Sequence, residues 1–448
     1  MDYDSFDVAY TEDSESEKIT LATPSILDAY NAREIRRLKN SASFRIGRIL
    51  TSAIIRPWKI IVLPIEIFYL IYCMGMERLG KRAVPFESRT QETLAQKTSD
   101  CVLFFPTNGV GFGHFTRMYA LAKRWRDQSP ATEIIFFTTM PTLHLLYSEN
   151  FLTYHISGRK KYKDITASQW NAMVEEQLSL IFSQHRPSTF VFDGAYPYRG
   201  MLNAIREVNG MQKVWMRRGM FKKGSNIPID SIQHFDLIIR PEDSTPMKPS
   251  EIDHSVETLV VPPIILLDRK DLLPKEQARM RLGLPIDGKV AYVQLGAGRI
   301  NNIESEVRLA VDALRSRDVI VVLGESMLGQ RLSIDMEGII LLRDYPNSMY
   351  FNAFDVSVQA GGYNSYHEVR KFGIPTVFFP NMETGMDDQL ARCKQAEEEG
   401  WGIVVQNRTK KTIQKAADQI LVMEKMTPIE EMNGALELFK QLDSRGHV

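Results

Sequence analysis

The stretch from 356 to 402 alternates strand-like and helix-like patterns, and its glycines and polar residues stand where the strands end. An apolar run leads into a glycine pair, a helix pattern follows at once, and a second apolar run at 376–380 precedes a polar loop. In open parallel sheets, ligands bind at the carboxyl ends of the strands. The stretch therefore predicts half of a nucleotide site, formed by Gly361, Gly362, Asn364, Ser365, Glu368, Asp388 and Gln389.

The same alternation runs through the chain from residue 100 onward. Short apolar runs bounded by glycine, proline or polar residues are typical of strands that are buried on both faces. When helix patterns separate such runs, they predict βαβ units and parallel sheets. We expect strands at 102–106, 133–139, 189–193, 213–216, 237–241, 289–296, 319–324, 339–346, 356–360 and 376–380, and helices at 115–126, 167–184 and 199–208.

A pair of prolines, Pro262 and Pro263, interrupts this series. Because proline does not sit inside a central strand or a helix, the segment 260–269 reads as an interdomain linker. We expect a first Rossmann-like domain at 100–261, a second at 262–425, and a C-terminal segment at 426–448. Its helix pattern, 429–442, would pack back on the first domain.

The first 99 residues do not follow the α/β pattern. The first twenty carry seven acids and one lysine without an apolar core, which indicates a partly disordered tail over 1–40 rather than a signal peptide. Eight basic residues against one acid then lie between Arg33 and Lys59, and the apolar run 60–76 carries a single charge, Glu66.

A spanning helix needs about 20 apolar residues, so this run is short for one. We expect 41–99 to be an amphipathic, membrane-associating segment whose residues 44–82 meet anionic headgroups at a membrane surface. A helical hairpin buried on the protein's own surface and a true span are the two alternatives.

Composition limits the remaining classes of function. Acidic and basic residues balance at 55 each, so the global charge gives no reason to expect a nucleic-acid partner. The cysteines Cys73, Cys101 and Cys393 are scattered and show no metal-binding spacing, which favours a reducing, cytoplasmic setting.

The turn after the first expected strand reads GVGFGH, with His114 at its end. Glycines let a ligand approach the backbone, and a helix start favours negative charge; Gly109, Gly111 and Gly113 thus form a candidate phosphate or acceptor loop. The spacing fits neither the dinucleotide fingerprint nor a Walker A loop. His114 is either a helix cap or a general base, and Asp193, at the end of a later strand, could orient it.

Other polar residues also have two interpretations. Glu368 either completes a capping box with Ser365 or accepts the hydroxyls of a ribose. Asp388 and Gln389, with Asp387, form either a helix N-cap or a set of acceptors for sugar hydroxyls. Gly296, Gly298 and Arg299 suit a diphosphate, while Arg217 and Arg218 either meet an acceptor phosphate or headgroups or form a solvated loop.

From residue 100 onward the chain resembles the GT-B glycosyltransferases, including the N-acetylglucosaminyltransferases of lipid-linked peptidoglycan and the UDP-glycosyltransferase-like enzymes. The motifs GVGFGH and GGYNSYHEVRKFGIPTVFFP followed by DDQ carry the resemblance. It implies two Rossmann-like domains facing a cleft, with the acceptor on the first and the nucleotide sugar on the second. It also implies that His114 is the base, Glu368 takes the ribose, Asp388 and Gln389 hold the donor sugar, and no metal is required.

Together these inferences predict a hexosyltransferase-like enzyme, peripheral on the cytoplasmic face of a membrane. It would move a sugar from a nucleotide-diphosphate sugar, UDP-linked, to a lipid-linked or polysaccharide acceptor without a cofactor. The alternatives are a nucleotide-sugar 2-epimerase of the same fold and a catalytically inactive sugar- or lipid-binding scaffold.

Overall fold

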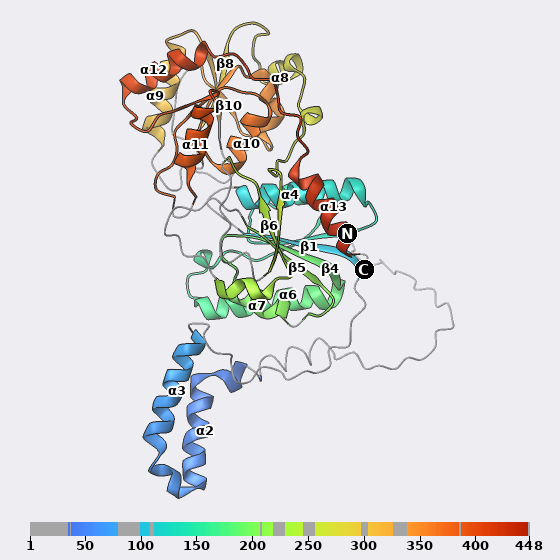
Figure 1. The fold of residues 1–448 in the computed structure, drawn as a ribbon, viewed down its shortest axis with the longest axis vertical. Helices are drawn as coiled ribbons and strands as arrows, with labels where there is room; N and C mark the ends of the chain where they lie inside the picture. The colour runs from blue at the N-terminus through green and yellow to red at the C-terminus, as the bar shows by residue number, and fades with distance from the viewer. Residues whose placement is uncertain are drawn as a thin grey trace, which may run out of the picture. The chain divides into compact units, whose positions relative to one another are not determined.

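A computed structural model describes residues 35, 37–78, 99–107, 112–206, 208–217, 229–244, 256–296, 303–325, 338–384 and 387–446. The chain divides into two compact units, within 1–91 and 92–448 (Figure 1). The second unit holds two sheets, and all of their described strand pairs are parallel.

The first sheet has the strand order β3-β2-β1-β4-β5-β6-β7. Its strands are β1 (Ser99–Pro106), β2 (Glu133–Thr138), β3 (Leu152–His155), β4 (Pro187–Asp193), β5 (Gln212–Met216), β6 (Leu237–Pro241) and β7 (Glu257–Val261). Its helices are α4 (Gly113–Gln128), α5 (His144–Tyr147), α6 (Ala167–His185) and α7 (Arg199–Arg206), with short 3-10 turns η2 (Arg159–Lys161) and η3 (Ile229–His234).

The sequence did not predict the two edge strands, β3 and β7. Both are half-exposed and lack a continuous apolar run. β7 also takes Val260 and Val261 from the expected linker, and Val261 pairs with Pro241 of β6. The prolines that marked the break therefore follow the last strand of the first sheet.

The second sheet has the order β10-β9-β8-β11-β12-β13. Its strands are β8 (Val290–Gln294), β9 (Ile320–Gly324), β10 (Ile340–Leu342), β11 (Val356–Gln359), β12 (Thr376–Phe378) and β13 (Gly402–Val404). Its helices are α8 (Lys275–Arg281), α9 (Glu304–Arg315), α10 (Tyr363–Lys371), α11 (Gln389–Glu398) and α12 (Lys410–Leu421), with 3-10 turns η5 (Arg269–Asp271) and η6 (Asn347–Ala353).

Aromatic side chains fill both faces of the first sheet. Phe104 of β1 packs against Phe136 of β2 on one face, and the next residue, Phe105, packs against Phe137 on the other. Successive side chains of a strand point to opposite faces, so burial on both faces requires an unbroken apolar run. This requirement explains why these strands could be predicted from the sequence.

The last helix, α13 (Gly434–Gly446), begins five residues later than the expected 429, because Asn433 caps it. The Asn433 Oδ1 accepts the Ala435 N–H at 3.0 Å, and its Nδ2 donates to the Ile265 carbonyl at 2.8 Å. Figure 1 shows α13 alongside α4, where the rings of Phe439 and Trp125 meet edge to face with centroids 5.3 Å apart. The end of the chain thus completes the core of the first sheet.

The first unit contains a helical hairpin of α2 (Ala42–Ile55), a 3-10 turn η1 (Pro57–Ile60) and α3 (Leu63–Arg78). The Ser41 hydroxyl caps α2 by accepting the Phe44 N–H at 3.2 Å, and α2 ends just before Pro57. Arg45 donates two hydrogen bonds to the Glu77 carboxylate, at 2.6 and 3.0 Å, which joins the open ends of the helices. Within the described residues, no helix has the length and apolar character to cross a membrane.

We predict that Phe439→Ala lowers the free energy of unfolding by about 3–5 kcal/mol, because it removes a buried ring from the core shared with α4. Calorimetry or denaturant unfolding would measure the loss. Met432→Ala is the matched control, since Met432 is exposed just before α13 and should change stability by less than about 0.5 kcal/mol. Equal losses for the two variants would contradict the docking of α13.

Candidate active site

Each sheet has one point at which its strand order reverses, between β1 and β4 in the first sheet and between β8 and β11 in the second. Ligands bind at such switch points, outside the carboxyl ends of the strands. His114 lies just after β1 and Asp193 ends β4, whereas Gly296 follows β8 and Gly361 follows β11. The candidate residues that lie just after these strands therefore collect at the two switch points.

At the first switch point, His114 and Asp193 are in contact. The His114 Nδ1 lies 2.6 Å from the Asp193 Oδ1, so the histidine in the first turn of α4 is held by the carboxylate that ends β4. A third residue, Arg117, donates from Nε to Asp193 Oδ2 and from Nη2 to Oδ1, both at 2.9 Å. The side chains of Asp193 and Arg117 are almost wholly buried, while that of His114 is partly exposed.

The charge on Asp193 is secured by these partners. Burial alone would raise its pKa, but Arg117 and His114 together hold the pKa of Asp193 below its ordinary value. The carboxylate therefore stays ionised at neutral pH, where it can stabilise a positive charge on the imidazole. This arrangement of a partly exposed histidine backed by a buried carboxylate suits a general base.

At the second switch point, Glu368 is half-buried in α10 and accepts a hydrogen bond from the Ser348 hydroxyl at 3.0 Å. Desolvation raises the pKa of Glu368 to about 7, while the bond from Ser348 acts in the opposite direction. Of the two interpretations of Glu368, the capping box with Ser365 is wrong, because α10 begins at Tyr363 with Gly362 as its N-cap. Glu368 therefore lies in the second turn and is not a cap.

The glycines at this switch point differ in how much space surrounds them. A Cβ on Gly361 would lie 2.1 Å from the Cys393 Sγ, so close packing against α11 demands glycine there. A Cβ on Gly362 would meet nothing within 4 Å, and Gly296 has a φ of 98° with open space around it. Among the described glycines of this switch point, Gly362 and Gly296 therefore leave room for a ligand beside the backbone.

The polar residues at the start of α11 make hydrogen bonds within the protein. Asp388 is the N-cap of this helix and accepts the Ala391 N–H at 3.1 Å, and Gln389 accepts the Asn381 N–H at 3.0 Å. The N-cap interpretation of Asp388 is thus confirmed. Asn364 and Ser365 lie half-buried in the first turn of α10.

One buried side chain at this point has no partner in the described part of the chain. Gln359 ends β11 and is 1% exposed, yet neither polar atom of its amide is hydrogen-bonded there. The Asn364 Oδ1 is in the same state. Because buried polar groups are nearly always satisfied, each of these two side chains is a position at which a ligand or water would bind.

Arg217 is not part of a solvated loop, as one interpretation had it. Its side chain is buried, and its guanidinium lies over the Trp215 ring at 5.3 Å from the centroid. The remaining candidates, Gly109, Gly111, Arg218, Gly298 and Arg299, lie outside the described residues. Gly113 is the first residue of α4, and a Cβ there would make only an ordinary contact, 3.8 Å from Arg117.

The two sheets meet through Arg392 of α11. Its Nε and Nη2 donate to Asp243, in the loop after β6, at 2.7 and 2.8 Å. The same guanidinium donates to the Gly361 carbonyl at 2.7 Å and to Asp387 at 2.8 Å. The side chains of Arg392 and Asp243 are almost wholly buried, so this ion pair lies inside the contact between the sheets.

Two tyrosines extend the contact. The Tyr363 ring lies between the guanidinium groups of Arg117 and Arg392, at 5.5 and 5.9 Å, and its hydroxyl donates to the Glu242 carbonyl at 3.0 Å. Tyr345 stacks on Phe112 and hydrogen-bonds Thr116 of α4 at 2.9 Å. The helix that carries His114 therefore touches the helix that carries Glu368.

Sequence reasoning missed Arg117, Asp243, Ser348 and Arg392. Arg117 had one available signal, because it stands one helical turn after His114 and thus on the same face of α4. The others come from loops or distant elements and had none. Within the described residues, no cluster of three or more histidine, cysteine, aspartate or glutamate side chains is placed to hold a metal ion.

Two parallel Rossmann-like sheets that meet at their carboxyl edges define the GT-B glycosyltransferase fold, as the sequence predicted. A spinosyn forosaminyltransferase shares it with a TM-score of 0.51 and 13% identity, over 77% of this chain and 95% of its own. A UDP-GlcNAc 2-epimerase from Methanocaldococcus jannaschii has a TM-score of 0.51 and 12% identity, over 77% of this chain and 99% of its own. These likenesses establish the fold alone.

One curated protein is similar in sequence. The chain is 26% identical over 150 residues to the UDP-N-acetylglucosamine–N-acetylmuramyl-(pentapeptide) pyrophosphoryl-undecaprenol N-acetylglucosamine transferase of Aquifex aeolicus. The match covers 32% of this chain and 43% of that protein, less than half of its length. No protein-family model matches the chain.

We predict that Gly361→Ala lowers the free energy of unfolding by about 1–3 kcal/mol, because the new Cβ collides with the Cys393 Sγ. Removing that sulfur in Gly361→Ala/Cys393→Ala should make the double loss smaller than the sum of the two single losses. Gly362→Ala is the matched control and should cost less than about 1 kcal/mol. Strictly additive losses would show that the glycine serves another purpose.

We predict that Glu368→Gln stabilises the fold at pH 8 by roughly 1–3 kcal/mol and has little effect near pH 4.5. The folded state keeps the Glu368 proton up to a pKa of about 7, whereas the unfolded chain releases it near 4.5, so stability falls as the pH rises between these values. Melting temperatures across this range would measure the gain. The exposed Glu398→Gln should give no such pH-dependent difference.

Proposed function

We propose that this protein transfers a sugar from a nucleotide-diphosphate sugar, UDP-linked, to a lipid-linked or polysaccharide acceptor. The observation that carries the proposal is the contact between His114 and Asp193 at the first switch point, next to the helix that carries Glu368. A general base and a nucleotide-binding carboxylate would then come from opposite sheets and meet at one site. The partial likeness to the Aquifex transferase supports the same reaction class.

In this proposal His114 removes the proton of the acceptor hydroxyl. The hydroxyl oxygen then forms a bond to the anomeric carbon while the bond from that carbon to the diphosphate oxygen breaks. The proton passes to the imidazole, and the bond's electron pair leaves with the nucleoside diphosphate. Asp193 holds the Nδ1 side of the ring and stabilises the imidazolium, and Arg117 keeps Asp193 ionised.

The donor would bind at the second switch point. Glu368 would accept the ribose hydroxyls, and Gly296 and Gly362 would let the nucleotide approach the backbone. The unpartnered amide of Gln359 would gain hydrogen bonds from the same ligand. Asp388 would reach the donor sugar with the oxygen lone pairs that its capping bond leaves available, and Gln389 would do so with the rest of its amide, which can both accept and donate.

We also propose that the enzyme works at the cytoplasmic face of a membrane, as a peripheral protein that meets its acceptor there. The exposed apolar surface of the α2–α3 hairpin supports this location. The reaction is proposed to need no bound metal ion, which activity in excess EDTA would test.

Two variants separate the proposed roles of the two switch points. His114→Ala should lower turnover by about 10²–10⁴-fold and leave UDP binding intact. Glu368→Ala should weaken UDP binding, whereas Glu398→Ala should not. Thermal shift with UDP, GDP, dTDP and CMP would report binding, because a ligand at one hundred times its Kd stabilises the folded state by about 2.7 kcal/mol. Full turnover in His114→Ala would place the base elsewhere.

Incubation with a UDP-sugar alone tests the rival 2-epimerase. An epimerised sugar formed without any acceptor would overturn the transferase proposal, whereas transfer that depends on added acceptor would support it. A protein that binds nucleotide but shows neither reaction would be the inactive scaffold.

A further inference from the structure

The α2–α3 hairpin, residues 42–78, exposes an unusually apolar surface. Five of its large apolar side chains are at least 70% exposed: Ile54 78%, Ile55 72%, Ile61 83%, Ile65 70% and Phe68 75%. Folded proteins rarely leave contiguous apolar surface of this kind uncovered unless another molecule covers it. The hairpin is therefore a docking surface.

The lack of charge along α3 indicates what kind of partner binds the hairpin. Its ten residues between Glu66 and Glu77 carry no charge on any face, and only one side of α3 packs on α2, through Leu70 and Cys73. A helix that is apolar all round belongs in an apolar medium. These ten residues span about 15 Å at 1.5 Å per residue, about half of a bilayer's hydrocarbon thickness of about 30 Å. It can enter one leaflet without crossing.

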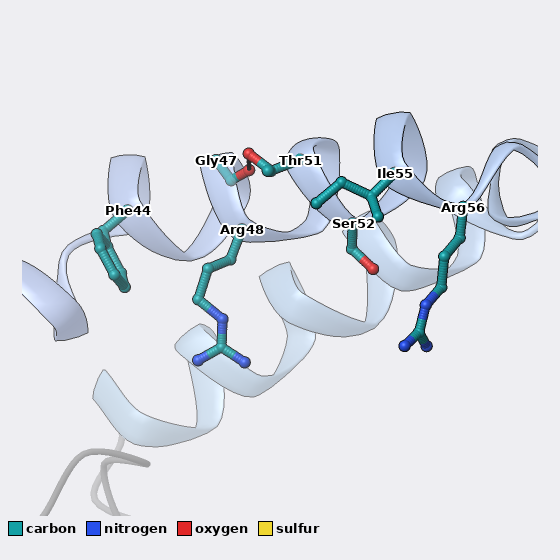
Figure 2. A pocket seen from close by; sticks show the side chains of 7 residues that line it. All are labelled: Phe44, Gly47, Arg48, Thr51, Ser52, Ile55 and Arg56. Carbon is teal, nitrogen blue, oxygen red and sulfur yellow. Dashed lines mark hydrogen bonds between the residues drawn. The ribbon is translucent and has the colours of Figure 1, made fainter.

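The basic residues of α2 indicate that the partner also carries negative charge. A groove of about 580 Å³ runs along α2 and is lined by Phe44, Gly47, Arg48, Thr51, Ser52, Ile55 and Arg56 (Figure 2). Figure 2 shows the side chains of Arg48, Ser52 and Arg56 extending to the same side of the helix. The described residues of the lining supply two guanidinium groups, hydroxyls and apolar carbon, but no acid. This combination matches a phosphate group attached to an acyl chain.

We propose that the α2–α3 hairpin docks on an anionic lipid bilayer, with Arg48 and Arg56 around a lipid phosphate in this groove and Ile54, Trp58 and Ile61 entering the acyl layer. Arginine side chains reach from an apolar level to the headgroups by extending their charged ends, and tryptophan favours the same interface. The proposal rests on the membrane association proposed above and adds to it the groove that takes the lipid phosphate and the side chains that enter the acyl layer.

The first test uses the full-length protein and vesicles of phosphatidylcholine, alone or with one part in three of phosphatidylglycerol. Flotation should show binding to the anionic vesicles that weakens with salt. Arg48→Gln/Arg56→Gln should reduce this partition by roughly thirty-fold, as expected for two arginines near an anionic surface. The control Lys410→Gln/Lys411→Gln removes the same charge from exposed positions of α12 and should bind normally.

The second test measures insertion. The other tryptophans, at 125, 170, 215 and 401, are buried, whereas Trp58 is 64% exposed. Brominated acyl chains should therefore quench Trp58 alone, and Trp58→Phe should abolish the quenching. Ile54→Ser/Ile61→Ser should lower vesicle binding at least about ten-fold, while Ile286→Ser/Val422→Ser, at equally exposed positions outside the hairpin, should not.

Three results would overturn the proposal. The first is equal vesicle binding by Arg48→Gln/Arg56→Gln and its control, and the second is no vesicle binding at all. The third is a lower melting temperature, or dissociation of a dimer, when the hairpin is substituted. The last would show that this chain or a second copy covers the hairpin. The UDP thermal shift is measured in parallel and should be unchanged by every hairpin variant. If the unaltered protein shows no thermal shift with UDP but still binds vesicles, that result would count against the proposed transferase activity and not against membrane docking.

Discussion

The guanidinium of Arg392 is the interaction on which the joined arrangement of the two sheets depends. An isolated buried charge is strongly destabilising, so it persists only where good geometry satisfies it. Burial by itself would lower the pKa of Arg392, but Asp387 and Asp243 raise it well above the ordinary value. Asp387 pairs with Arg392 from the second sheet's side and Asp243 from the first, so the full set of ion pairs to this guanidinium forms only while the sheets are in contact. The placement of His114 near α10 follows from that contact.

Two carboxylates at the two switch points are held in opposite electrostatic states. Asp193 is saturated by cationic and imidazole donors, and its pKa lies below the ordinary value. Glu368 has a single hydroxyl donor, and desolvation raises its pKa to about 7. The first carboxylate is therefore committed to its protein partners, while the second gains stability from any ligand that brings hydroxyl donors to it. Such a difference in environment is typical of groups with different tasks in one site.

The sequence identified what depends on backbone periodicity and little of what depends on side-chain partners. The strands buried on both faces were found because that environment requires unbroken apolar runs. The suggestion that Asp193 could orient His114 came from the place of Asp193 at a strand end in the same expected domain, but their contact could not be predicted from the sequence. The edge strands β3, β7 and β13 were missed because they are short and partly exposed and so need no long apolar run. The capping box at Glu368 was wrong because Gly362, three residues before Ser365, already caps the helix.

The side-chain partners that lie far apart in the chain could not be predicted from the sequence. Asp243 and Arg392 are 149 positions apart, and no local pattern distinguishes them from ordinary surface charges. The need for glycine at 361 likewise comes from Cys393 on another helix, not from a ligand. The signals that sequence does carry, glycine turns and strand ends, locate a site but do not say which of its residues the protein uses for its own packing.

The ion pair of Arg45 and Glu77 has a consequence for the hairpin as a whole. It carries no net charge, and both side chains are buried between the helices. The attraction between two opposite charges grows as the dielectric constant of their surroundings falls. The pair would therefore hold α2 and α3 together more firmly in lipid than in water. The hairpin would then keep its shape when it moves from water to a membrane.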